Sequence, residues 1–122
     1  MSRGKGIVIA VLLIAGIARG QDIVKIAPKE VKVILDNAEA RVFEVVLKKG
    51  VPIGMHSHPP YVVYALTPAK VHFTLPDKST SDLAMLAGEA HWSNGGAHSQ
   101  VALEDGRILV IELKKAKPLR KK

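Results

Sequence analysis

Two of the five histidines stand two residues apart, in His56-Ser57-His58, and this spacing is the clearest chemical signal in the sequence. Residues two apart in an extended strand project from the same face, so we expect both imidazoles to point the same way. Neutral imidazole is a good ligand for divalent iron, zinc, copper or nickel. A third ligand must come from elsewhere, and His98, which follows a glycine-rich turn, is the candidate. The alternative is a pair of surface or interface imidazoles.

The elements that position these histidines are predicted to be short strands. Apolar residues recur with period two, turn residues separate the runs about every ten residues, and this pattern favours an all-β sandwich or barrel. If the segment around His56 and His58 is extended, it directs both imidazoles to the same face. The other predicted strands are 31–35, 41–47, 61–66, 71–75, 83–86, 90–93, 98–103 and 108–113.

Residues 1–20 have the layout of a secretory signal peptide. A basic head is followed by the uncharged apolar run from Gly6 to Ala18, and small residues precede a predicted cleavage site between Gly20 and Gln21. The alternatives are a membrane anchor, for which the run is short, and a buried N-terminal helix. We therefore expect an exported protein, periplasmic or secreted, with no stable membrane insertion after cleavage.

Composition excludes several kinds of function. The chain has no cysteine, so disulfides, thiolate ligands and cysteine nucleophiles are absent. The formal charge of +7 resides in the leader and in a basic tail, residues 114–122, because residues 21–113 hold nine basic and eleven acidic residues. No aromatic residue is interleaved with the basic tail, and we expect no nucleic-acid partner.

Two segments resemble the sequence motifs of the cupin superfamily, small single-domain cupin 2 type. Gly50 to Pro59 is similar to the first motif, in which a glycine precedes an H-x-H pair, and Gly88 to His98 is similar to the second. The resemblance covers about Val42 to Leu113. It implies a single-domain double-stranded β-helix, or jelly-roll barrel, of six to ten strands over residues 21–113. It also implies that His56, His58 and His98 bind a metal inside the barrel.

The chain departs from the family pattern in its acidic ligand. The glutamate that usually follows the first motif would fall at Val62 or Val63. The second motif differs as well. Asn94 stands at a position that proline often holds, and His98 comes one residue earlier than in the commonest spacing. Three neutral imidazoles would leave the ion its full charge and several open coordination positions, which suits Lewis-acid or oxygen chemistry. A weakened site that no longer holds metal is the alternative. Glu44 and Glu89 are possible replacement carboxylates, but neither spacing supports them.

Three further side chains are candidates for lining the cavity. Tyr64 has the strand parity of His56 and His58, unless Pro59-Pro60 inserts a bulge. His72 either lines the cavity or lies in solvent. His91 belongs to the second motif without holding its ligand position, so a packing or supporting role is expected.

Two binding functions remain open at this point, besides a purely structural role in which the histidines are not needed. One is a small exported protein that binds a divalent metal. In its catalytic version this protein is a metal-dependent enzyme that acts on a small molecule. The metal stays open among iron, zinc, manganese, nickel and copper. The other is a non-enzymatic barrel that binds a small ligand and has a degenerate metal site. We also expect a homodimer, because cupins commonly pair and two-fold pairing is the commonest oligomer.

Overall fold

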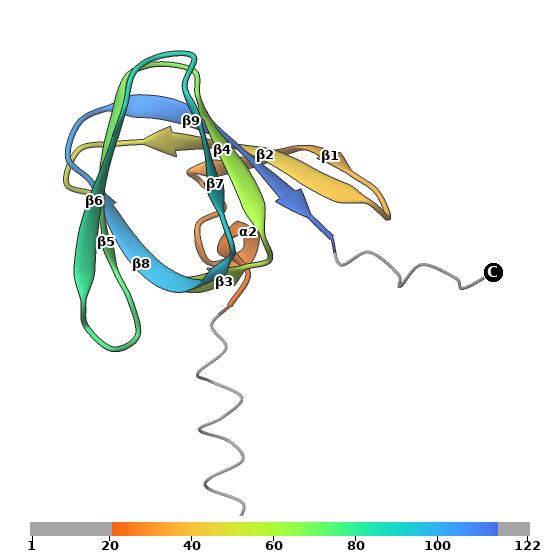
Figure 1. Cartoon of the computed structure of the whole chain (residues 1–122), viewed down its shortest axis with the longest axis horizontal. Helices are drawn as coiled ribbons and strands as arrows, with labels where there is room; N and C mark the ends of the chain where they lie inside the picture. The colour runs from red at the N-terminus through yellow and green to blue at the C-terminus, as the bar shows by residue number, and fades with distance from the viewer. Residues whose placement is uncertain (1–20, 115–122) are drawn as a thin grey trace, which may run out of the picture.

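The computed structural model describes residues 21–114, which form two facing antiparallel β-sheets (Figure 1). The predicted leader, residues 1–20, and the tail beyond Lys114 lie outside the described residues. One short helix, α2 (Ile23–Ile26), precedes the sheets. Nine strands follow within the described part: β1 (Val31–Asp36), β2 (Ala40–Leu47), β3 (Pro52–His58), β4 (Tyr61–Ala65), β5 (Ala69–Thr74), β6 (Thr80–Met85), β7 (Ala90–Ser93), β8 (Gly96–Ala102) and β9 (Gly106–Leu113). No helix among these residues is long and apolar enough to cross a membrane.

The strand order is that of a jelly-roll sandwich. One sheet has the order β1-β2-β9-β4-β7 and the other has the order β3-β8-β5-β6, with antiparallel pairing throughout. Strands far apart in sequence are neighbours, as β2 and β9 show in Figure 1. The predicted all-β jelly-roll fold is confirmed.

Alternation along the strands builds the core between the sheets. Phe43 and Val45 of β2 face inward with Val110 of β9, Val63 of β4 and Val71 of β5, and all five are buried. The short helix α2 contributes Ile23, which is 2% exposed, to the same core. Side chains between these positions face outward, as period two requires.

Local chemistry explains two of the places where the structure departs from the sequence prediction. The four-residue helix α2 begins because Asp22 caps it, its Oδ1 accepting a hydrogen bond from the Val24 amide at 3.0 Å. Strand β6 extends over the polar residues Thr80 to Asp82, where a strand was predicted only over 83–86. Its backbone pairs with β5 along the whole length, from Ala69 to Thr74, and pairing does not require apolar side chains.

The turn that leads into β8 depends on a glycine. Gly95 has a φ of +86°, and a Cβ placed there would lie 2.6 Å from the carbonyl oxygen of His58. The missing side chain therefore lets the turn before β8 approach the end of β3. These two strands are the ones that bear the histidine cluster.

Candidate metal centre

Three histidines meet on the inner face of neighbouring strands. His56 and His58 lie on β3, and His98 lies on β8 directly opposite His56 in the antiparallel register. The two residues of β3 project to one side because they are two apart. The predicted spacing argument for this pair therefore holds in the structure.

The three imidazoles form a cluster that is compatible with metal binding. One ring nitrogen from each of His56, His58 and His98 lies within 4.8 Å of the others. Ring centroids are 4.9 Å apart for His56 and His58, 4.8 Å for His56 and His98, and 5.3 Å for His58 and His98. Such a set of neutral nitrogen donors suits a first-row divalent metal.

Hydrogen bonds to the Nδ1 atoms set the tautomers of the two β3 histidines. His56 Nδ1 lies 2.7 Å from the Gly54 carbonyl oxygen, and His58 Nδ1 lies 2.6 Å from Glu112 Oε2. A carbonyl or carboxylate oxygen only accepts, so each Nδ1 carries the proton. In a neutral ring with this tautomer, Nε2 has a free lone pair, which is the form that binds a metal.

The remaining nitrogen atoms fit a metal ion. Nε2 of His56 and Nε2 of His98 are buried, and neither has a hydrogen-bond partner among the described residues. Buried polar atoms are rarely left without a partner, so these two Nε2 atoms indicate a position where a ligand binds. Burial lowers the pKa of His56 to about 4 and that of His98 to about 3, which keeps both rings neutral near pH 7.

A cavity of about 320 Å³ lies beside the cluster, between the two sheets. His58 and His98 line it, whereas His56 is 0% exposed. Most of the lining is apolar, and Gln100 and Tyr61 are among its polar groups. Asp82 is the acidic residue of the described lining, which holds no lysine or arginine. This is the composition of a site for a small molecule.

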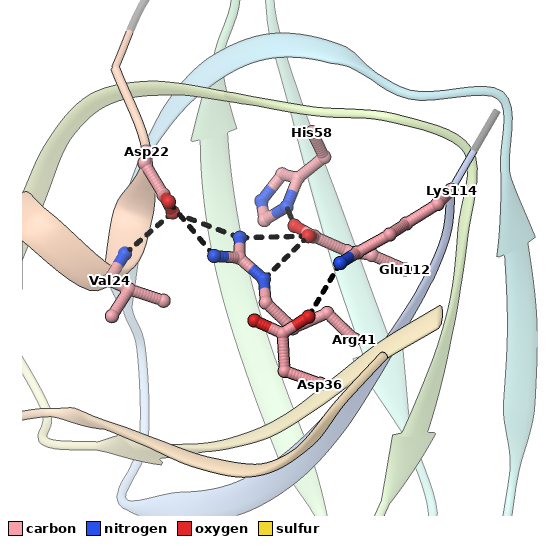
Figure 2. A network of polar contacts seen from close by, with 7 residues as sticks. All are labelled: Asp22, Val24, Asp36, Arg41, His58, Glu112 and Lys114. Atoms are coloured by element: carbon pink, nitrogen blue, oxygen red, sulfur yellow. Dashed lines mark hydrogen bonds and ion pairs between the residues drawn. The ribbon is translucent and has the colours of Figure 1, made fainter. Parts of the chain in front are cut away.

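A buried carboxylate, that of Glu112, hydrogen-bonds to the histidine cluster at His58 Nδ1. Glu112 of β9 points inward and is 3% exposed, with one oxygen on His58 Nδ1 and the other 2.8 Å from Arg41 Nη2 (Figure 2). Arg41 in turn makes two hydrogen bonds of 2.9 Å to Asp22. These hydrogen bonds from Arg41 lower the pKa of Asp22. A continuous polar chain thus runs from the start of the barrel domain to His58.

The other candidates occupy different places. Tyr64 lies on the outer face of β4 and is 37% exposed, because the turn at Pro59-Pro60 changes the parity between β3 and β4. Tyr61 is the tyrosine that reaches the cavity from this strand. His72 is half-buried and binds Asp82 through Nδ1, while His91 lines the cavity with a largely exposed side chain.

Neither carboxylate considered as a replacement ligand is near the cluster. Glu44 faces outward and binds Arg107, and Glu89 accepts a hydrogen bond from the Leu86 amide. Glu112, which contacts His58, was missed from the sequence. Its signal was parity: Ile108 and Val110 face the core, and a glutamate at the next inward position marks a buried polar group.

Sequence comparison finds no matching family model and no matching curated protein. Solved structures do match. A cupin domain from Bordetella pertussis aligns with a TM-score of 0.62 and 22% identity, over 70% of this chain and 92% of that one. The chain has the cupin fold.

Two further solved structures match less closely. A cupin-2 domain protein from Shewanella frigidimarina has a TM-score of 0.51 and 18% identity, over 70% of this chain and 81% of its own. KdgF from a Halomonas species has the same TM-score and 18% identity, over 71% and 79% of the two chains. At these identities the likeness concerns the cupin fold alone, and function rests on the site.

Proposed function

We propose that this protein is a small exported cupin-fold protein that binds one divalent metal ion through His56, His58 and His98. The observation that carries the proposal is the pair of buried, unpartnered Nε2 atoms on His56 and His98. These atoms lie within reach of a His58 nitrogen, in the set whose members are all within 4.8 Å of one another. Export rests on the leader layout of residues 1–20 alone.

We propose further that the bound ion acts on a small molecule in the adjoining cavity. A divalent metal with three protein ligands and open positions supplies Lewis-acid or oxygen chemistry. Apolar side chains make up most of the cavity wall, and Gln100 and Tyr61 offer polar groups that orient a ligand. The described lining holds one carboxylate, Asp82, and no lysine or arginine, so the metal would be the positive group that a ligand meets there.

Metal content of the purified protein tests the binding proposal. We expect about one equivalent of iron, zinc, manganese, nickel or copper in tag-free protein by mass spectrometry, and a loss of that metal in the His56→Ala/His58→Ala variant. The matched control is His72→Ala, which removes a histidine bound to Asp82 outside the cluster and is expected to retain the metal.

No metal in the wild-type protein, even after incubation with excess ions, would contradict the proposal. The alternative function, a barrel that binds a small ligand without metal, would then account better for the cavity. That alternative expects ligand-induced stabilisation that is insensitive to chelators.

A further inference from the structure

We propose that Glu112 is a positioning residue for the metal site, fixing His58 as a ligand and placing a negative charge behind it. The inference rests on the proposed metal binding. Glu112 belongs to the last strand, β9, whereas the three histidines belong to β3 and β8 of the other sheet. The carboxylate therefore joins the two sheets at the histidine cluster.

Arg41 determines which way the Glu112 carboxylate faces. The two residues are direct cross-strand partners on β2 and β9, and Arg41 donates to Glu112 Oε1 from Nε at 3.0 Å. A guanidinium group has donors only. Arg41 itself is held by two hydrogen bonds to Asp22, so Oε2 of Glu112 remains for His58 Nδ1.

Figure 2 shows how the members of this network are joined. Arg41 hydrogen-bonds to Asp22 on one side and to Glu112 on the other. The Glu112 side chain is 4% exposed, whereas that of Asp22, at the far end of the network, is 33% exposed and partly solvated. Buried charges are normally paired, and Glu112 is paired with Arg41 on one oxygen and with His58 Nδ1 on the other.

The chain has no glutamate at Val62 or Val63 to bind a metal directly. Glu112 instead places its carboxylate next to the cluster by binding His58. A carboxylate that accepts the second N–H of a ligating histidine fixes the tautomer and makes the ring a stronger donor. Glu112 stands in that relation to His58, and it does so from a strand far away in sequence.

Replacement by glutamine gives a sharp prediction because of Arg41. The amide oxygen of a Glu112→Gln side chain must face the donors of Arg41, so its NH₂ group faces His58 Nδ1. His58 then has to accept at Nδ1 and carry its proton on Nε2. A protonated Nε2 cannot bind a metal. One nearly isosteric change thus removes the metal-binding lone pair from His58.

The test combines two measurements on the full mature protein. Long-range ¹H–¹⁵N correlation spectra of the metal-free protein at pH 7.5 report the His58 tautomer, and competition with a chromophoric chelator reports zinc affinity. We expect an unprotonated Nε2 in wild type, a protonated Nε2 in Glu112→Gln, and zinc affinity weaker by about 10- to 100-fold in that variant. Glu44→Gln, which alters the outward-facing pair with Arg107, is the matched control and should change neither measurement.

Each contrary result has a distinct meaning. A proton on His58 Nε2 in the metal-free wild type at pH 7.5 overturns the role of Glu112, whether or not the variant folds. Unchanged tautomer and affinity in a folded Glu112→Gln protein overturn it as well. Failure of wild type to bind zinc or any other divalent ion overturns the proposed function, and the positioning role with it.

Discussion

Two arginine–glutamate pairs link β2 and β9, one on each face of the same sheet. Arg41 and Glu112 lie on the inner face, with side chains 16% and 4% exposed. Arg107 and Glu44 lie on the outer face, with side chains 53% and 17% exposed. Residue types and strands are the same, so the difference between the pairs comes from burial and from what each pair touches.

The inner pair is part of a longer network of hydrogen bonds, and the outer pair is not. Glu112 reaches His58 and Arg41 reaches Asp22, so the inner bonds extend from the N-terminal segment to the histidine cluster. Burying charges costs free energy, and removing one partner leaves the other without compensation. An exposed pair gains little because water and salt screen it. The inner pair therefore forms at a cost in desolvation free energy, which fits a role at the site.

The largest effect on stability is expected from truncating the inner glutamate. Glu112→Ala leaves His58 Nδ1 without its acceptor and Arg41 with Asp22 alone, so we expect a loss of about 3 kcal/mol in the free energy of unfolding. Urea denaturation in the presence of a chelator measures this loss for the metal-free protein. Glu44→Ala is the comparison, with an expected loss below about 1 kcal/mol. Equal losses in the two variants would remove the distinction between the faces.

A smaller effect per residue is expected from acid, through the inner-face histidines. Burial lowers the pKa values of His56 and His98 to about 4 and about 3, below those in the unfolded chain. Between about pH 6.5 and these values the unfolded state binds protons that the folded state does not, so stability falls as the pH falls. Asp22 stays ionised at pH 5, because Arg41 lowers its pKa.

Denaturation of the metal-free protein at pH 7.5 and pH 5 measures this effect. We expect a loss of about 2 kcal/mol for each of the two histidines, so each contributes less than the truncation of Glu112. The His98→Gln variant should lose less on acidification than wild type, since one buried titrating group is gone. A pH dependence that is identical in wild type and His98→Gln would show that His98 is not buried in neutral form.

Much of this architecture was predictable from strand parity. Period two identified most strands and placed His56 and His58 on one face. Parity within β9 also contained the signal for Glu112, because the inward positions before it are Ile108 and Val110. What that residue binds was not predictable, since its contact with Arg41 depends on how β9 pairs with a strand 71 residues away.

Parity failed where a turn interrupts the strands. Tyr64 was expected to share the face of the histidines, but the turn at Pro59-Pro60 shifts the alternation by one residue and brings Tyr61 inward. The helix α2 was missed because four residues are too few to show helical periodicity. Both errors arise from local geometry between elements, which an alternating pattern does not encode.

X-ray absorption spectroscopy of the zinc-loaded protein tests the three-histidine site most directly. We predict a spectrum with three imidazole nitrogens at about 2.0–2.1 Å from zinc, and one fewer imidazole in His98→Ala. Two or fewer imidazoles in wild type, or a spectrum unchanged in His98→Ala, would contradict a centre formed by His56, His58 and His98.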